Sequence, residues 1–127
     1  MRVAFLCLGV MGYPMAGHLA RSGYSVTVYN RTTAKAEKWA AEYGGHFAQT
    51  PEQAAEGCDF VLACVGNDND LRSVTTGENG AFHGLKSGAI FIDHTTASAE
   101  VARELAVEVE HRRVLLAGRA QPAADGG

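Results

Sequence analysis

Phe5-Leu6-Cys7-Leu8-Gly9-Val10-Met11-Gly12 is the stretch that decides which fold we expect for this chain. It ends a continuous apolar run, Val3 to Leu8, which is typical of a strand buried on both faces of a parallel sheet. Gly9 and Gly12 then give the pattern x-x-G-x-x-G, and Pro14 is tolerated in the first turn of a helix. The stretch therefore predicts a buried strand, a tight turn and a helix.

The same alternation of strand and helix patterns continues through the chain. Helices are predicted near residues 14–21, after Thr32 or Thr33, from Thr50, at 68–74 and after Ser98. Strands are predicted at 3–8, 24–29, 46–48, 60–65, 89–93 and 113–117. This order predicts an α/β fold, a Rossmann-type doubly wound parallel sheet in a single domain. We expect the nucleotide-binding domain to cover residues 1–112 and a divergent tail, frayed at its Gly-, Ala- and Pro-rich end, to cover 113–127.

Composition narrows the function classes. The 127 residues are 46% hydrophobic and 20% charged, as in ordinary globular domains, and this excludes a disordered or fibrous chain. A net charge of -3 gives no basic field for nucleic acid. Three cysteines without C-x-x-C spacing and scattered histidines argue against a disulfide framework or a zinc site. The N-terminal apolar run is too short for a membrane span or a signal peptide, so we expect a cytoplasmic protein without a membrane partner.

The glycine turn has a physical reason to bind a dinucleotide. A glycine at position 9 lets backbone approach a pyrophosphate, Gly12 lets the helix pack closely on the strand, and the helix N-terminus faces the anion. An ordinary strand-to-helix connection would use the same two glycines. Cys7 replaces the first glycine of G-x-G-x-x-G, which costs about 1–2 kcal/mol if that position needs positive φ; alternatively it is a small buried hydrophobe. The cofactor contacts expected from this turn are Leu8, Gly9, Val10, Met11 and Gly12.

The end of the second strand predicts which cofactor binds. Sites selective for NAD place Asp or Glu about 20 residues after the glycines, where it binds the ribose 2′-hydroxyl. This chain has Asn30-Arg31-Thr32 instead, so no carboxylate at the strand end repels a 2′-phosphate. Arg31 can grip that phosphate with its guanidinium fork, Thr32 can donate a hydroxyl, and Lys35 can add a charge. Alternatively, Arg31 is an ordinary solvent-exposed basic residue that follows a strand and binds no ligand. We expect NADP, with NAD as the weaker ligand.

These residues resemble a known family, the β-hydroxyacid dehydrogenases, which include 3-hydroxyisobutyrate dehydrogenase and the glyoxylate/succinic semialdehyde reductases. The family opens with G-x-G-x-M-G-x-P-M-A-x-N-L, and the likeness covers about residues 2–110. Its matching positions here are Gly9, Met11, Gly12, Pro14, Met15, Ala16 and Leu19, with His18 where the family has Asn. Asn30-Arg31-Thr32 looks like the NADP-preferring branch.

The resemblance implies further cofactor contacts after later strands. Val65 and Gly66 stand in the loop that lies along the cofactor in the family, and they would contact it through backbone groups. Asp70 stands at the position of a further residue that contacts the cofactor, and Thr96 at the position of the threonine that approaches the nicotinamide. Without the family, the threonines at 95 and 96 suggest only a cap and turn.

The family's Ser-Gly-Gly substrate motif and catalytic lysine have no counterpart in these residues, since neither Lys38 nor Lys86 has the right context. We therefore assign no catalytic residue, and we take the family's C-terminal helical domain to be absent. Two interpretations stay open. The chain is the NADP-binding domain of an oxidoreductase that transfers hydride to or from a small 3-hydroxy acid or aldehyde, or it is a truncated NADP-binding module without turnover. A ligand-free structural protein is a third. Exposure of the face that the missing domain covers would favour homo-oligomers.

Overall fold

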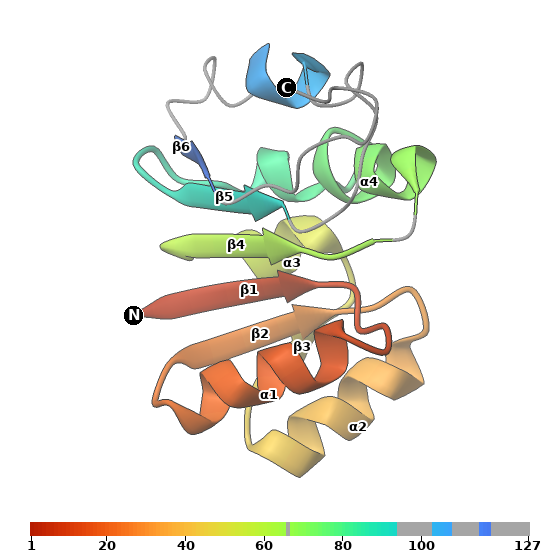
Figure 1. The fold of residues 1–127 in the computed structure, drawn as a ribbon, viewed down its shortest axis with the longest axis vertical. Coiled ribbons are helices and arrows are strands. Elements are labelled where there is room, and N and C mark those ends of the chain that lie inside the picture. Colours follow the sequence, from red (N-terminus) through yellow and green to blue (C-terminus); the bar gives the residue numbers. More distant parts are fainter. Residues whose placement is uncertain (66, 94–102, 108–114, 118–127) are drawn as a thin grey trace.

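The computed structural model describes residues 1–65, 67–93, 103–107 and 115–117, and Figure 1 shows their arrangement. Within this described part, all strand pairs are parallel and form one sheet of six strands in the order β3-β2-β1-β4-β5-β6. The strands are β1 (Arg2–Leu6), β2 (Ser25–Tyr29), β3 (His46–Ala48), β4 (Phe60–Ala63), β5 (Ile90–Asp93) and β6 (Leu115–Ala117). β6 falls within the strand predicted at residues 113–117.

Helices connect the strands as the sequence pattern predicted. The elements are α1 (Gly12–Arg21), α2 (Thr33–Tyr43), α3 (Pro51–Ala55), α4 (Asp68–Thr75) and the 3₁₀ turn η1 (Ala81–His83), and residues 103–107 are also helical. Side-chain caps begin two of the helices: Thr50 Oγ1 accepts the Gln53 N–H at 3.1 Å, and Asn67 Oδ1 accepts the Asp70 N–H at 2.9 Å. Thr32 precedes α2, but its hydroxyl makes no capping bond.

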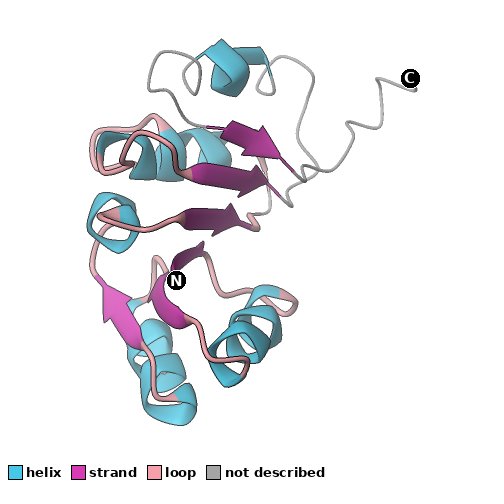
Figure 2. Ribbon diagram, turned by 90° about the vertical axis from the view of Figure 1, so that its left-hand side faces the viewer, coloured by secondary structure: helices cyan, strands magenta, loops and turns pink. Residues whose placement is uncertain are grey.

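Both faces of the sheet carry a core, which is the doubly wound arrangement. On one face, α1 and α2 pack through Ala16 and Trp39 on Val3 and Phe5 of β1. On the other, α3, α4 and η1 pack on residues of β1 and β4 that alternate with the first set. Figure 2 shows these two layers on opposite sides of the strands. The predicted fold class is confirmed.

The central strands end two residues earlier than the apolar runs predicted. β1 stops at Leu6 and β4 at Ala63, although Cys7 N–H still donates to Tyr29 O at 2.7 Å and Cys64 N–H to Leu6 O at 3.2 Å. The cause at β1 is Cys7, whose φ of 77° turns the chain out of the extended conformation. The strand order also reverses at this point, because β2 lies on one side of β1 and β4 on the other. Such a switch point is where open α/β sheets bind ligands.

Candidate cofactor site

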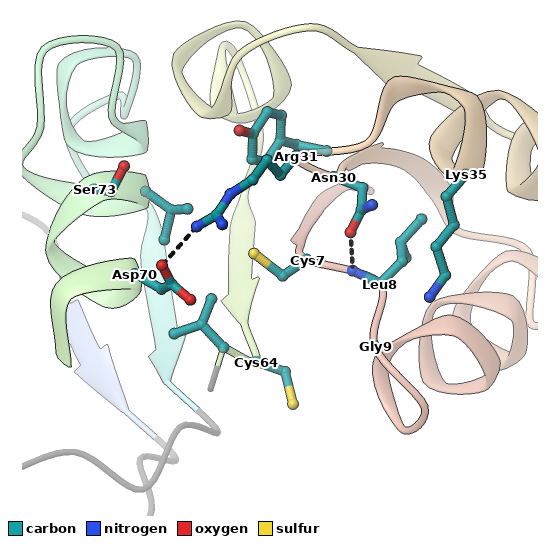
Figure 3. A pocket seen from close by; sticks show the side chains of 12 residues that line it. Cys7, Leu8, Gly9, Asn30, Arg31, Lys35, Cys64, Asp70 and Ser73 are labelled. Atoms are coloured by element: carbon teal, nitrogen blue, oxygen red, sulfur yellow. Dashed lines mark hydrogen bonds and ion pairs between the residues drawn. The ribbon is translucent and has the colours of Figure 1, made fainter. Parts of the chain in front are cut away.

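A cavity of about 310 Å³ opens at the carboxyl end of β1, between the segments that follow β2 and β4. Figure 3 shows it from close by. Seven residues predicted from the sequence line it: Leu8, Gly9, Asn30, Arg31, Lys35, Val65 and Asp70. Cys7 lies on its wall too, together with four residues that the sequence did not single out for the site: Tyr29, Cys64, Ser73 and Val74. Tyr29 and Cys64 stand where β2 and β4 end, a position that could have suggested them.

The two glycines of the turn serve different purposes. A Cβ at Gly12 would lie 2.6 Å from the Cys7 carbonyl oxygen and 3.1 Å from Phe5 Cε1, so only glycine lets α1 approach β1 this closely. A Cβ at Gly9 would meet nothing within 4 Å, so the space above its backbone is open to a ligand. This geometry agrees with the roles expected for close packing and for backbone approach.

Four residues that were predicted as contacts do not line the cavity: Val10, Met11, Gly12 and Thr32. Val10 is 93% exposed and Met11 68% exposed, at the tip of the turn. Met11 precedes α1 without a side-chain cap, and the first turn of α1, which is described throughout, holds no acidic residue. The positive end of the helix is therefore left for an anion from outside.

Asn30 acts as a brace between two loops. Its Oδ1 accepts the Leu8 N–H at 2.9 Å, and its Nδ2 donates to Thr32 O at 3.2 Å. The Leu8 N–H is thereby used inside the protein, and its side chain is buried in the core on the α1 side of the sheet, so Leu8 offers neither group freely to a ligand. Figure 3 shows this bond, and beside it Lys35 extends from α2 past Leu8 toward the glycine turn.

Arg31 forms an ion pair across the cavity. Its Nη2 lies 2.6 Å from Asp70 Oδ1, although Arg31 follows β2 and Asp70 belongs to α4. The Arg31 side chain is 79% exposed and that of Asp70 is 34% exposed. The guanidinium thus projects into solvent at the mouth of the cavity, where a phosphate can reach it.

Cys7 occupies the left-handed region, at φ 77°, where the family has glycine. Burial raises the pKa of the Cys7 thiol to about 12, and the negative charge of Asp70 contributes further to the rise. The thiol is therefore neutral at physiological pH, and it packs against the core that β1 and β4 share. Both sequence interpretations of Cys7 thus have a counterpart: the backbone needs positive φ, and the side chain is a small hydrophobe.

Replacing Cys7 with glycine should stabilise the domain by removing this strain. A non-glycine residue in the left-handed region costs about 1–2 kcal/mol, and the lost thiol packing offsets part of that gain. Cys7→Ala is the matched control, because it removes the thiol but keeps the Cβ. We expect Cys7→Gly to exceed Cys7→Ala by about 1 kcal/mol in free energy of unfolding, measured by urea denaturation. Equal stability of the two variants would show that the turn is relaxed with a side chain.

Two predicted contacts, Gly66 and Thr96, lie outside the described residues. In the part of the chain that the structure covers, no three His, Cys, Asp or Glu side chains gather to hold a metal ion. None of its helices combines the length and apolar character needed to cross a membrane.

A doubly wound parallel sheet, with a glycine turn at its switch point and an open cavity beside it, defines a Rossmann-type nucleotide-binding domain. The chain belongs to the family described as the NAD binding domain of 6-phosphogluconate dehydrogenase, whose model matches residues 2–119.

The chain is also similar to part of several longer proteins, among them an oxidoreductase and a 3-hydroxyisobutyrate dehydrogenase-like protein. It is 62% identical over 109 residues to an "Uncharacterized oxidoreductase" of Shewanella frigidimarina, covering 86% of this chain and 38% of that protein. It is 38% identical over 111 residues to "Probable 3-hydroxyisobutyrate dehydrogenase-like 2, mitochondrial" of Arabidopsis thaliana, covering 87% of this chain and 37% of that protein. A solved imine reductase from Myxococcus stipitatus, in complex with NADP+, matches with a TM-score of 0.79 at 25% identity, over 91% of this chain and 39% of that one. The chain thus spans well under half the length of these proteins and matches their NAD(P)-binding part.

Proposed function

We propose that this domain binds NADP(H) in preference to NAD(H), as the cofactor-binding part of an oxidoreductase acting on a small 3-hydroxy acid or aldehyde. The observation that carries the proposal is Arg31, which follows β2 and lines the cavity at the switch point. The segment that follows β2, Asn30-Arg31-Thr32, contains no acidic residue to accept a ribose 2′-hydroxyl. A guanidinium at this place suits a 2′-phosphate, because it can donate two parallel hydrogen bonds.

Other parts of the site would bind the remaining parts of the cofactor. The open space over Gly9 and the uncapped N-terminus of α1 suit the pyrophosphate. Lys35 adds a positive charge on the α2 side of the cavity. Val65 lines the opposite wall, and we assign Gly66 and Thr96 to the nicotinamide half on the family resemblance. Solved imine reductases of this fold hold NADP+ in one case and NAD+ in a variant, so the choice between the two cofactors rests on Arg31.

Bound NADP(H) would accept or supply the hydride, and the residues of this domain would bind and orient it. The groups that the resemblance implies for substrate, the Ser-Gly-Gly motif and a catalytic lysine, are not among the 127 residues. Related domains occur in an imine reductase and in a 3-hydroxyisobutyrate dehydrogenase-like protein, so the substrate is set elsewhere. All three cysteines are free thiols, which fits the cytoplasmic location predicted from the sequence.

A stand-alone NADP-binding module is the second candidate. The stretch Val114-Leu115-Leu116-Ala117-Gly118 stands where the family has the strand that leads into its substrate motif, and that motif is missing. Such a module would bind the cofactor with the same selectivity and show no turnover. Cofactor binding is therefore the first property to measure.

Calorimetric titration of NADPH and NADH into the wild type and Arg31→Ala tests the proposal. A charge-assisted contact is worth about 1.5–3 kcal/mol. Because Arg31 is largely exposed and must leave Asp70, we expect the low end, so wild type should bind NADPH about 10-fold more tightly than NADH. Arg31→Ala should lose that preference and keep its NADH affinity within about twofold. Arg21→Ala is the control, since it removes an arginine at the end of α1, outside the cavity. Equal affinities of the wild type for both cofactors would refute the proposal.

A further inference from the structure

The cavity holds a carboxylate that the segment after β2 lacks. Asp70 comes from α4, 39 residues further along the chain, and its Oδ1 meets Arg31 Nη2 at 2.6 Å. Figure 3 shows the two side chains pointing toward each other across the mouth of the cavity. The group that would grip a 2′-phosphate is thus already paired with an anion of the protein itself.

The two partners are held very differently. Asp70 Oδ2 accepts from Asn67 Nδ2 at 3.2 Å, and the Asp70 N–H donates to Asn67 Oδ1 at 2.9 Å. The carboxylate also stands in the first turn of α4, where the helix dipole favours negative charge. Asp70 therefore has partners that remain when Arg31 leaves. The Arg31 side chain is 79% exposed, so it is the partner that can change conformation to meet a ligand.

We propose that Asp70 is a specificity-determining residue that competes with the 2′-phosphate of NADP(H) for Arg31. The proposal rests on the proposed function, in which Arg31 selects NADP(H). To bind the phosphate, the guanidinium must give up the carboxylate, and the phosphate dianion must lie close to an anchored negative charge. NAD(H) carries no 2′-phosphate and meets neither cost. Asp70 thus reduces the preference for NADP(H) that Arg31 creates, so that the affinities of the domain for the two cofactors differ by a modest factor.

A different role for Asp70 makes the opposite prediction. If its carboxylate accepts a ribose hydroxyl, removing the charge weakens binding of NADH and NADPH together. If the ion pair only ties α4 to the segment after β2, removing it lowers stability and leaves the ratio of affinities unchanged. The two affinities and the melting temperature therefore separate the three roles.

The test is titration of NADPH and NADH into wild type, Asp70→Asn, Arg31→Ala and the double variant. Asp70→Asn keeps the backbone cap to Asn67, because that bond uses the residue's N–H. We expect Asp70→Asn to bind NADPH about 3- to 10-fold more tightly, because the phosphate no longer has to break the exposed Arg31–Asp70 ion pair and is no longer repelled by the Asp70 carboxylate. Its affinity for NADH should stay within about twofold of wild type. In the Arg31→Ala background, Asp70→Asn should raise NADPH affinity by less than half of the factor seen in the wild-type background, since no guanidinium remains to be released.

Asp68→Asn is the matched control. It removes the other carboxylate of the same helical turn, and Asp68 does not line the cavity. It should reproduce any change in melting temperature from the helix dipole and leave the NADPH to NADH ratio as in wild type. Unchanged or weaker NADPH binding in Asp70→Asn overturns this inference, provided Arg31→Ala still loses NADPH affinity. If Arg31→Ala instead binds NADPH as tightly as wild type does, the proposed function is overturned.

Discussion

Replacing Gly12 with alanine is expected to reduce cofactor affinity by about 100-fold or more and to lower the free energy of unfolding by about 1–3 kcal/mol. The added Cβ would lie 2.6 Å from the Cys7 carbonyl oxygen, far inside van der Waals contact. That oxygen cannot move aside easily, because the Cys7 N–H is bonded to Tyr29 O at 2.7 Å. The start of α1 must shift instead, and its N–H donors then miss the pyrophosphate. Losing two charge-assisted hydrogen bonds accounts for the affinity change.

Calorimetry and urea denaturation measure the two parts of this prediction, and Gly9→Ala separates them. Since nothing lies within 4 Å of a Cβ at position 9, Gly9→Ala should keep wild-type stability within about 0.5 kcal/mol. It should nevertheless bind NADPH more weakly, because the methyl group occupies the space expected for the pyrophosphate. Wild-type affinity in Gly12→Ala would place the cofactor away from this turn.

Replacing Trp39 with alanine is expected to cost about 3–5 kcal/mol of stability, a large share of the about 5–15 kcal/mol that holds a typical domain together. The side chain is fully buried in the core between the sheet and helices α1 and α2. Its Nε1–H donates to Tyr13 O at 3.2 Å, and its ring stacks at a tilt on Tyr43, with centroids 5.4 Å apart. Removal of the indole would leave a cavity between the sheet and these two helices.

Urea denaturation followed by circular dichroism measures this loss, because Trp39 is the single tryptophan and its fluorescence disappears with it. Tyr24→Ala is the control, an aromatic residue that is 40% exposed, and it should cost less than about 1 kcal/mol. A loss below about 1 kcal/mol in Trp39→Ala would mean that α2 contributes little to the core. Addition of NADPH should raise the midpoint of both variants by mass action.

The features that the sequence predicted best are local ones. The order of strands and helices, the close approach at Gly12 and the position of Arg31 after β2 follow from periodicity and from the glycine turn. Cys7 is the instructive case: a residue other than glycine at a fingerprint position indicated a choice between strain and packing, and the structure has both.

The interactions that escaped prediction join residues far apart in the sequence. The Asn30 brace to Leu8 spans 22 residues, and the Arg31 pair with Asp70 spans 39. Asp70 was expected at the cofactor on the family resemblance, but no spacing rule indicates that it meets Arg31. Such a pairing depends on the strand order, which places β4 beside β1, and on the cap that orients the first turn of α4. The end of β1 was likewise placed too late, because hydrophobicity does not reveal where a backbone turns.

The central position of β1 has a consequence for how the chain is synthesised. β1 leaves the ribosome before the other strands of this sheet, yet one of its neighbours, β4, begins only at Phe60, which pairs with Val3. The sequence between them can form the half-sheet of β1, β2 and β3 earlier, and during that interval one edge of β1 has no partner strand. Contacts of such long sequence separation slow folding, and an open apolar edge invites pairing with other chains. This edge of β1 therefore stays open to other chains until the residues of β4 have been added.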